Sequence, residues 1–263
     1  MLLSDKVALV TGAAGVYGGV LSRTLAAHGA RVAMVDRDGE RLERVAALLR
    51  GAGADVLPIT ADLTADGAPE AVVAEMLAAF GRLDLLVNNA ARLLVEPLER
   101  VSLEAWDATV AVNVRAAYAL CQAVRPAMEE QGSGAIVNVT SIAARTAAMD
   151  RSVYALSKAA LHSVTQSVAA EWGRLGIRCN SISFGGLPWS MSGSFDDADG
   201  DLADPSLPLG RRGARAEFAE PVVFLASDMA SYVTGTEVVI DGGRGLTLLG
   251  LGSPHRPEAY TRA

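Results

Sequence analysis

Two ionisable side chains four residues apart, Tyr154 and Lys158, could carry out proton transfer together. The sequence from about Ser152 onward is rich in alanine and has no helix breaker before Gly173, so it predicts a helix. Residues four apart on a helix share a face, and the phenol and the ammonium could therefore reach one small volume. A free tyrosine has a pKa of about 10, too high for a base at neutral pH, and a neighbouring cation lowers it. The pair alone is also typical of an ordinary amphipathic helix.

A serine at the end of a predicted strand could join this pair. Residues 135–140 form an apolar run that predicts a buried strand, and Ser141 follows it, thirteen positions before the tyrosine. Its hydroxyl could hold a substrate oxygen while the tyrosine exchanges a proton with that oxygen. The three side chains together predict proton transfer at a carbonyl or carbinol oxygen.

A glycine-rich turn near the N-terminus is typical of dinucleotide binding. Residues 7–10 read as a strand buried on both faces, residues 11–18 read T-G-A-A-G-V-Y-G, and a helical pattern continues to His28. Between a strand and a helix, glycines let the backbone approach a pyrophosphate, and the helix N-terminus offers N–H groups and the positive end of its dipole. We therefore expect a nucleotide cofactor at this turn.

The residue after the second predicted strand, residues 31–35, bears on the choice of cofactor. Asp36 stands there and can accept hydrogen bonds from the ribose hydroxyls, while its charge would repel a 2′-phosphate. It favours NAD over NADP. Arg37 is a counter-signal, because an arginine can pair with that phosphate.

These motifs, taken in order, resemble the short-chain dehydrogenase/reductase family. Besides the glycine-rich turn and the Ser-Tyr-Lys trio, the chain has Asn-Asn-Ala-Ala at residues 88–91 after a predicted strand, and Asn113 within a predicted helix. The resemblance covers Lys6 to about Gly243. It implies that Tyr154 is the general acid/base, that Lys158 lowers its pKa and holds the nicotinamide ribose, and that Ser141 positions the substrate oxygen. In this family the asparagine bends its helix and anchors a water that relays protons to the lysine.

The resemblance also implies a set of cofactor contacts. The first asparagine of residues 88–91 stabilises the sheet in the family, and the rest of that backbone lines the cofactor. Asp62 would bond the adenine amino group and Leu63 would pack on its ring, although Asp62 could instead cap a helix before Thr64. The expected contacts are Gly12, Gly15, Tyr17, Gly18, Asp36, Arg37, Asp62, Leu63, Asn89, Ala90, Ala91, Tyr154, Lys158, Gly185 and Leu187.

Three positions depart from the family pattern. Val16 stands where the short-form branch has its second glycine, directly after Gly15, and it could crowd the cofactor. Phe184 and Trp189 replace a proline and a threonine that the family uses near the nicotinamide. Trp189 could stack on the substrate or fill the base of a lid.

A stretch of low periodicity, about residues 186–210, is where the family has its mobile substrate lid. Its five acids argue mildly against an anionic substrate such as a phosphate, or they form a solvated face. Substrate contacts expected from Leu94, Ala143, Trp189 and Met191 suggest an apolar, bulky or cyclic ligand.

Composition excludes several classes of protein. The net charge of −7 argues against nucleic-acid binding, and no apolar run reaches the length of a membrane span. No signal peptide is evident. Cys121 and Cys179 have no metal-ligand spacing, which predicts buried thiols, no metal site and a cytoplasmic protein.

We expect one α/β domain over residues 1–263: a Rossmann-type, doubly wound parallel sheet of about seven strands in three layers, ordered 3-2-1-4-5-6-7. Two long helices, about residues 112–131 and 152–174, would pair subunits in a homotetramer or homodimer, and the apolar tail at residues 244–263 would pack on another subunit. The expected function is NAD-dependent interconversion of a secondary alcohol and a ketone. The alternatives are an NADP-linked ketone reductase and a cofactor-binding protein without turnover.

Overall fold

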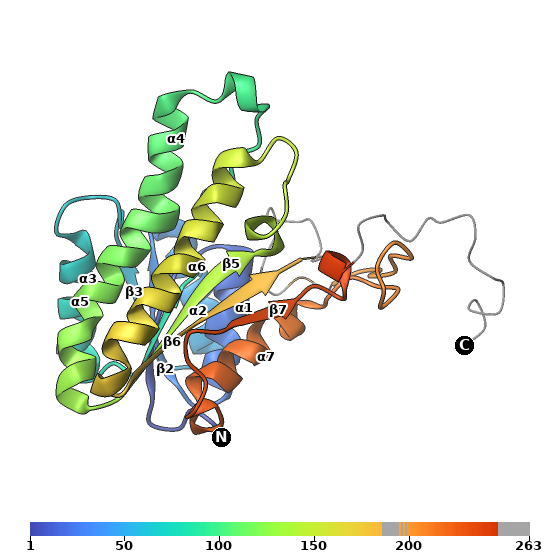
Figure 1. Cartoon of the computed structure of the whole chain (residues 1–263). Coiled ribbons are helices and arrows are strands. Elements are labelled where there is room, and N and C mark those ends of the chain that lie inside the picture. Colours follow the sequence, from blue (N-terminus) through green and yellow to red (C-terminus); the bar gives the residue numbers. More distant parts are fainter. Residues whose placement is uncertain (186–194, 196, 198, 247–263) are drawn as a thin grey trace.

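Seven parallel strands form one central sheet in the order β3-β2-β1-β4-β5-β6-β7, as predicted (Figure 1). The computed structural model describes residues 1–185, 195, 197 and 199–246. The strands are β1 (Val7–Thr11), β2 (Arg31–Asp36), β3 (Val56–Thr60), β4 (Leu85–Asn88), β5 (Gly134–Ser141), β6 (Ile177–Phe184) and β7 (Glu237–Ile240).

Helices cover both faces of this sheet and make the three predicted layers (Figure 1). One buried cluster joins the sheet to α1, α2 and α7, and a second joins it to α3, α5 and α6. The helices are α1 (Val16–Ala27), α2 (Gly39–Gly51), α3 (Ala68–Phe80), α4 (Leu103–Val110), α5 (Ala116–Gln131), α6 (Ser152–Trp172) and α7 (Arg215–Ala226). Short helical turns are η1 (Leu98–Arg100), η2 (Ala111–Arg115), η3 (Ile142–Ala144), η4 (Gly173–Leu175), η5 (Asp228–Ala230) and η6 (Arg244–Leu246).

The central strands read as continuous apolar runs because both of their faces are buried. Every residue of β1 is buried, and its side chains alternate between the layers: Val10 belongs to the α1 side and Leu9 to the α3 side. Thus the short run at residues 7–10 sits at the centre of the sheet, where the chain order reverses between β1 and β4.

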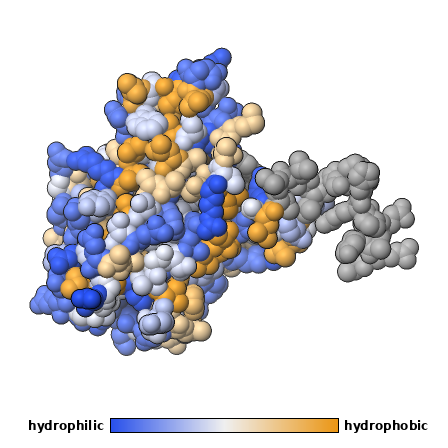
Figure 2. All heavy atoms as spheres, viewed as in Figure 1, coloured by the Kyte–Doolittle hydropathy of each residue, from blue (hydrophilic) through white to orange (hydrophobic). Residues whose placement is uncertain are grey.

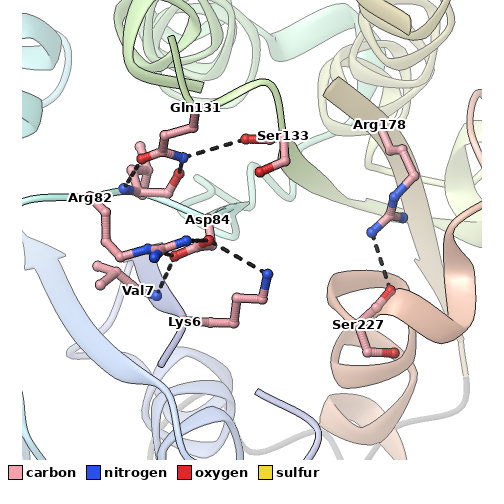
Figure 3. Close-up of polar contacts among 9 residues, drawn as sticks. Lys6, Val7, Arg82, Asp84, Gln131, Ser133, Arg178 and Ser227 are labelled. Atoms are coloured by element: carbon pink, nitrogen blue, oxygen red, sulfur yellow. Dashed lines mark hydrogen bonds and ion pairs between the residues drawn. The ribbon is translucent and has the colours of Figure 1, made fainter. Parts of the chain in front are cut away.

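A buried carboxylate fixes the end of the sheet where the strands begin (Figure 3). Asp84 precedes β4, and its carboxylate accepts hydrogen bonds from the Val7 amide at 2.9 Å and from two nitrogens of Arg82 at 2.7 and 2.9 Å. Lys6 adds an ion pair with Asp84 at 3.7 Å. The Gln131 side chain donates to the Leu83 carbonyl at 2.8 Å and accepts from the Leu83 amide at 3.0 Å, which ties the end of α5 to the same point. This cluster does not reach the opposite edge of the sheet, where the strands end, and that edge is available to bind a ligand.

A chain of buried polar side chains crosses the layer between the sheet and α6. The Asn88 amide donates to Asn138 at 2.8 Å, and Asn138 donates to Thr165 on α6 at 2.9 Å. Both cysteines are free and buried beside this chain, as predicted. Burial raises the pKa of Cys121 to about 12, so this thiol stays protonated. Asn88 therefore helps to hold the central strands and α6 together, the role that the family resemblance implied.

Candidate active site

A cleft of about 710 Å³ lies over the ends of β1, β2, β4, β5 and β6. It spans the place where the strand order reverses, which is where open parallel sheets bind ligands. Its volume lies within the usual range of small-molecule sites, about 300–1,000 Å³. The predicted site residues that line it are Gly12, Gly15, Tyr17, Gly18, Asp36, Asn89, Ala90, Ala91, Ser141, Ala143, Tyr154, Lys158 and Gly185.

Some predicted residues are not part of this lining. Arg37, Asp62, Leu63, Leu94 and Asn113 do not line the cleft, whereas Leu93 does. Leu187, Trp189 and Met191 lie outside the described residues, so their expected contacts stay predictions.

The glycines of the glycine-rich turn are needed for different physical reasons. Gly12 has a φ of +66°, which favours glycine, and a Cβ on Gly18 would lie 2.1 Å from the Gly12 carbonyl oxygen. A Cβ on Gly15 would meet only that oxygen, at 3.2 Å, so the fold demands a glycine at Gly15 far less. Val16 is buried in the first turn of α1 and lines the cleft. Close approach of a ligand would account for Gly15, while crowding of that ligand by Val16 stays a prediction.

The turn after β4 is joined directly to the glycine-rich turn. The Thr11 hydroxyl accepts hydrogen bonds from the Asn89 and Ala90 amides, each at 3.0 Å. The Asn89 side chain donates to the Thr11 carbonyl at 2.8 Å. A Cβ on Gly12 would lie 2.9 Å from the Ala90 Cα, so the two turns are in direct contact. Together they line one side of the cleft.

Asp36 faces the cleft from the end of β2. Its carboxylate accepts hydrogen bonds from the Ala14 amide at 3.0 Å and from the Asp38 amide at 3.1 Å, which fixes it beside the glycine-rich turn. By contrast, Asp62 accepts from the amide and hydroxyl of Thr64, at 2.9 and 2.7 Å. These bonds, and more weakly the charge of Arg37, lower the pKa of Asp62. In the protein alone Asp62 is thus engaged with Thr64 in a turn; it does not cap α3, which begins at Ala68 with Gly67 as its N-cap, and its contact with the adenine stays a prediction.

Tyr154, Lys158 and Ser141 converge in the cleft, as their spacing predicted. The Lys158 ammonium lies 5.8 Å from the centre of the Tyr154 ring and donates a hydrogen bond to the Val139 carbonyl at 2.7 Å. The Ser141 hydroxyl lies near enough to Tyr154 to lower its pKa, and it accepts a hydrogen bond from the Ala143 amide at 3.2 Å. The two α6 side chains therefore share one face of the helix and meet the end of β5.

Burial shifts the pKa values of Tyr154 and Lys158 in the protein without cofactor. Burial raises the pKa of Tyr154, and the Ser141 hydrogen bond and the charge of Arg151 only oppose that rise. Burial also lowers the pKa of Lys158 to about 8. The predicted lowering of the tyrosine pKa by Lys158 is therefore not a property of the protein alone. The reason is that burial makes the phenolate and the ammonium both costly.

Asn113 lies in η2, a π-helical segment between α4 and α5, which interrupts the predicted long helix. Its side chain accepts from the Arg92 amide at 2.7 Å and donates to the Arg92 carbonyl at 3.1 Å and to the Ser157 hydroxyl at 2.9 Å. These bonds occupy both amide hydrogens. The side-chain oxygen accepts one of the two hydrogen bonds it can take, so it could still bind the expected relay water. That role stays a prediction.

Phe184, the replacement for the family's proline, has a packing role. Its ring lies 4.1 Å from the ring of Phe218 on α7, centre to centre, and Phe218 in turn lies 4.7 Å from the ring of Tyr17. All three rings line the cleft. The departure from the pattern thus builds an aromatic wall between β6, α7 and the glycine-rich turn.

The sequence prediction missed an ion pair between a buried carboxylate and a half-exposed arginine that holds the Ser141 segment. Glu237 on β7 has a side chain only 4% exposed, and it accepts a hydrogen bond from the Thr140 hydroxyl at 3.1 Å and an ion pair from Arg145. Thr140 precedes Ser141 by one residue, and Arg145 follows it by four. The Glu237 carboxylate therefore contacts residues on both sides of Ser141 in the chain. The only signal was an acid inside an apolar strand, T-E-V-V-I.

We expect Lys158→Met to stabilise the fold in a way that depends on pH. Lysine has a pKa of about 10.4 in an unfolded chain, and burial lowers the pKa of Lys158 to about 8 in the folded protein. The charged ammonium therefore destabilises the fold, and this effect has its full size below a pH of about 8. After about 2 kcal/mol is subtracted for the lost hydrogen bond of the charged donor, the variant should gain about 1 kcal/mol in free energy of unfolding at neutral pH.

The gain should shrink as the pH rises above about 8 and should vanish only above about 10.4, where the wild-type lysine is neutral in both states. Urea unfolding of both proteins at several pH values measures the difference. A difference that stays constant across this range would show that Lys158 carries no buried charge.

Glu237→Gln should loosen the Ser141 segment without unfolding the protein. Glutamine can still accept from Thr140 but loses the charge that holds Arg145, so amide exchange at Ala143 and Arg145 should quicken about tenfold, equivalent to about 1.4 kcal/mol. Hydrogen exchange followed by mass spectrometry measures this. Glu217→Gln, which removes the exposed ion pair with Arg211, is the control and should act only near residues 211–217.

The described part of the chain contains no cluster of three or more side chains that could ligate a metal, and no helix long and apolar enough to cross a membrane.

Comparison with known proteins agrees with this geometry. Residues 12–244 match the family model described as enoyl-(acyl carrier protein) reductase. The chain is 40% identical to D-threitol dehydrogenase of Mycolicibacterium smegmatis, over 92% of this chain and 93% of that protein. It is 38% identical to 2-(R)-hydroxypropyl-CoM dehydrogenase of Xanthobacter autotrophicus, over 90% and 98% of the two chains.

A similar solved structure is the crystal structure of a gluconate 5-dehydrogenase from Burkholderia cenocepacia in complex with NADP and tartrate. It superposes with a TM-score of 0.85 at 30% identity, covering 94% of this chain and 97% of the other. Fold, cleft and sequence agree, and the chain belongs to the short-chain dehydrogenase/reductase family, NAD(P)-dependent oxidoreductases that act on alcohol and ketone groups.

Proposed function

We propose that this protein is an NAD-dependent oxidoreductase that interconverts a secondary alcohol and a ketone on a small to medium substrate. The observation that carries the proposal is the meeting of Ser141, Tyr154 and Lys158 in one cleft beside a glycine-rich turn. The named relatives are dehydrogenases of hydroxyl-bearing compounds, which supports the reaction type.

In the proposed reaction each of the three side chains has one task. Tyr154 removes the hydroxyl proton of the alcohol, and Ser141 holds the same oxygen by a hydrogen bond. The carbinol carbon loses a hydride as its bond to oxygen becomes a carbonyl. NAD, when bound, would supply the hydride acceptor. Lys158 would hold the nicotinamide ribose. Asn113 in η2 would help to place the water that relays protons to Lys158.

Asp36 supports NAD over NADP. Its carboxylate is fixed in the cleft, where it can accept bonds from ribose hydroxyls and would repel a 2′-phosphate. Arg37 is exposed, does not line the cleft, and exerts its charge on Asp62. The NADP-linked reductase stays the alternative, because a similar protein was crystallised with NADP.

The molecule also presents surfaces that suit a homotetramer or homodimer. Apolar side chains gather at the projecting end of the molecule that holds α4, where Leu98 and Leu103 are 73% and 81% exposed (Figure 2). A shallow hollow between α5 and α6 is lined by residues that include Tyr118, Trp172 and Leu175. Helix faces of this kind are expected to pair two copies of the chain.

Residues 1–263 would then act as one domain, with a lid at about residues 186–210 and a tail at 244–263. The tail starts at η6, whose Arg244 lines the cleft. Two free cysteines fit the reducing cytoplasm.

Tyr154→Phe should abolish turnover and keep cofactor binding. Phenylalanine fills the same space but cannot exchange a proton, so kcat should fall about 10³-fold. Absorbance of the reduced nicotinamide measures turnover, and its fluorescence measures binding. Turnover at the wild-type rate would refute the role of Tyr154. A wild-type protein that binds NADH tightly but oxidises no alcohol of a broad panel would favour the non-catalytic alternative.

Titration of NADH and NADPH tests the cofactor preference. The wild-type protein should bind NADH about tenfold or more tightly than NADPH, and Asp36→Ser should narrow that ratio by removing the charge that opposes the 2′-phosphate. Arg37→Gln is the matched variant and should leave both affinities unchanged. A loss of NADPH affinity in Arg37→Gln would instead assign the phosphate to Arg37.

A further inference from the structure

The short helical turn η3 determines where the Ser141 hydroxyl points. Ser141 is the N-cap of η3, and its hydroxyl oxygen accepts a hydrogen bond from the Ala143 amide at 3.2 Å. A serine hydroxyl has one proton to donate and two lone pairs that can accept. Because the Ala143 amide takes one lone pair, the proton can be donated to an oxygen in the cleft. The direction of that donation therefore depends on how η3 is held.

Glu237 contacts both ends of η3 from another strand of the sheet. Its carboxylate accepts a hydrogen bond at 3.1 Å from the hydroxyl of Thr140, the residue before the N-cap. The same carboxylate is paired with the guanidinium of Arg145, the C-cap of the turn. The Arg145 amide donates to the Ile142 carbonyl at 3.0 Å, which joins the arginine to the turn itself. A shift of this carboxylate would therefore displace both ends of η3.

The middle of η3 packs against the end of β6. A Cβ on Gly185 would lie only 2.4 Å from the Cδ1 atom of Ile142. The Ile142 side chain thus fills the space that a side chain at Gly185 would need, and both residues line the cleft. Apolar packing holds the middle of the turn, while the polar contacts with Glu237 hold its two ends.

Fold stability is a poor explanation for this ion pair. The side chain of Glu237 is 4% exposed and that of Arg145 is 53% exposed, so the carboxylate loses its water while the guanidinium keeps much of its own. Burying a charge costs free energy, and a buried ion pair often stabilises a protein no more than apolar residues of the same volume. Such a pair can instead select one arrangement of the groups around it. Here those groups flank Ser141.

We propose that Glu237 is a positioning residue of the reaction, which acts through Thr140 and Arg145 to orient the Ser141 hydroxyl toward the substrate oxygen. This inference rests on the proposed function and adds to it a residue that does not line the cleft. The carboxylate exchanges no proton and no electron with the substrate. Its effect is geometric, because hydrogen bonds weaken steeply as their angle worsens, and a displacement of about 1 Å can cost about 100-fold in rate.

A double-mutant cycle on kcat tests this role. Glu237→Gln should lower kcat about tenfold on the best alcohol of a panel, while the Kd of NADH changes less than twofold. In the Ser141→Ala protein, which has no hydroxyl to orient, the same substitution should lower kcat less than twofold. An equal loss in both backgrounds would assign Glu237 to the fold in general, and no loss in either would show that it is not needed; both results overturn the inference.

Asp84→Asn is the matched control for this cycle. Asp84 is also a buried carboxylate paired with an arginine, but it lies where the strands begin. Any loss of kcat that it causes should be the same with and without the Ser141 hydroxyl. If Glu237→Gln does not fold, Thr140→Val takes its place, because valine has nearly the shape of threonine and removes one of the two contacts. It should lower kcat severalfold only where the Ser141 hydroxyl is present, and an equal effect in both backgrounds overturns the inference.

A measurement without turnover separates this inference from the proposed function. The carbon-13 resonance of the Tyr154 Cζ atom, assigned by its loss in Tyr154→Phe, reports on hydrogen bonding at the phenol oxygen, which Ser141 influences. Glu237→Gln should shift this resonance toward its position in Ser141→Ala, and Asp84→Asn should leave it in place. If no alcohol is oxidised, the proposed function fails, and the resonance still decides on Glu237. An unchanged resonance in Glu237→Gln overturns the inference.

Discussion

The hydrogen bond from the buried Lys158 ammonium to the Val139 carbonyl is the contact on which the site depends. It fixes α6 across β5, close to where β5 ends at Ser141. Lysine is rare here: of 23 basic residues only Lys6 and Lys158 are lysines. A guanidinium keeps its charge at any accessible pH, whereas a lysine can be buried with a lowered pKa, as it is at Lys158. The choice of lysine thus suits a cation that must enter the core.

The sheet brings the glycine-rich turn and the turn after β4 to the edge at which Ser141 lies. Because all seven strands are parallel, their ends meet there, and the order reverses between β1 and β4. The hydrogen bonds between Thr11 and Asn89 join the two turns at that reversal. The cluster around Asp84 holds the other end, so the strands are fixed where they begin and open to a ligand where they finish.

Much of this could be predicted, because the relevant signals are local. Apolar runs indicated buried strands, and the four-residue spacing of Tyr154 and Lys158 indicated a shared face. The ion pair of Arg145 and Glu237 could not be predicted, since it joins residues 92 positions apart through the packing of β7. The π-helical turn at Asn113 and the raised pKa of Tyr154 depend on surroundings that only the assembled fold supplies.

The raised pKa of Tyr154 explains why the site gathers positive charge. A phenol shielded from water can direct a proton to one oxygen, but the same shielding disfavours its anion. Lys158 is still charged at neutral pH, yet burial outweighs the groups that favour the phenolate, and the pKa of Tyr154 stays raised in the protein alone. Arg151 contributes further positive charge from the start of the helix, and the positive ring of NAD, once bound, would contribute more. In the proposed reaction, therefore, the positive charge of the oxidised cofactor would favour the phenolate of Tyr154 and so would assist proton removal when the hydride acceptor is bound.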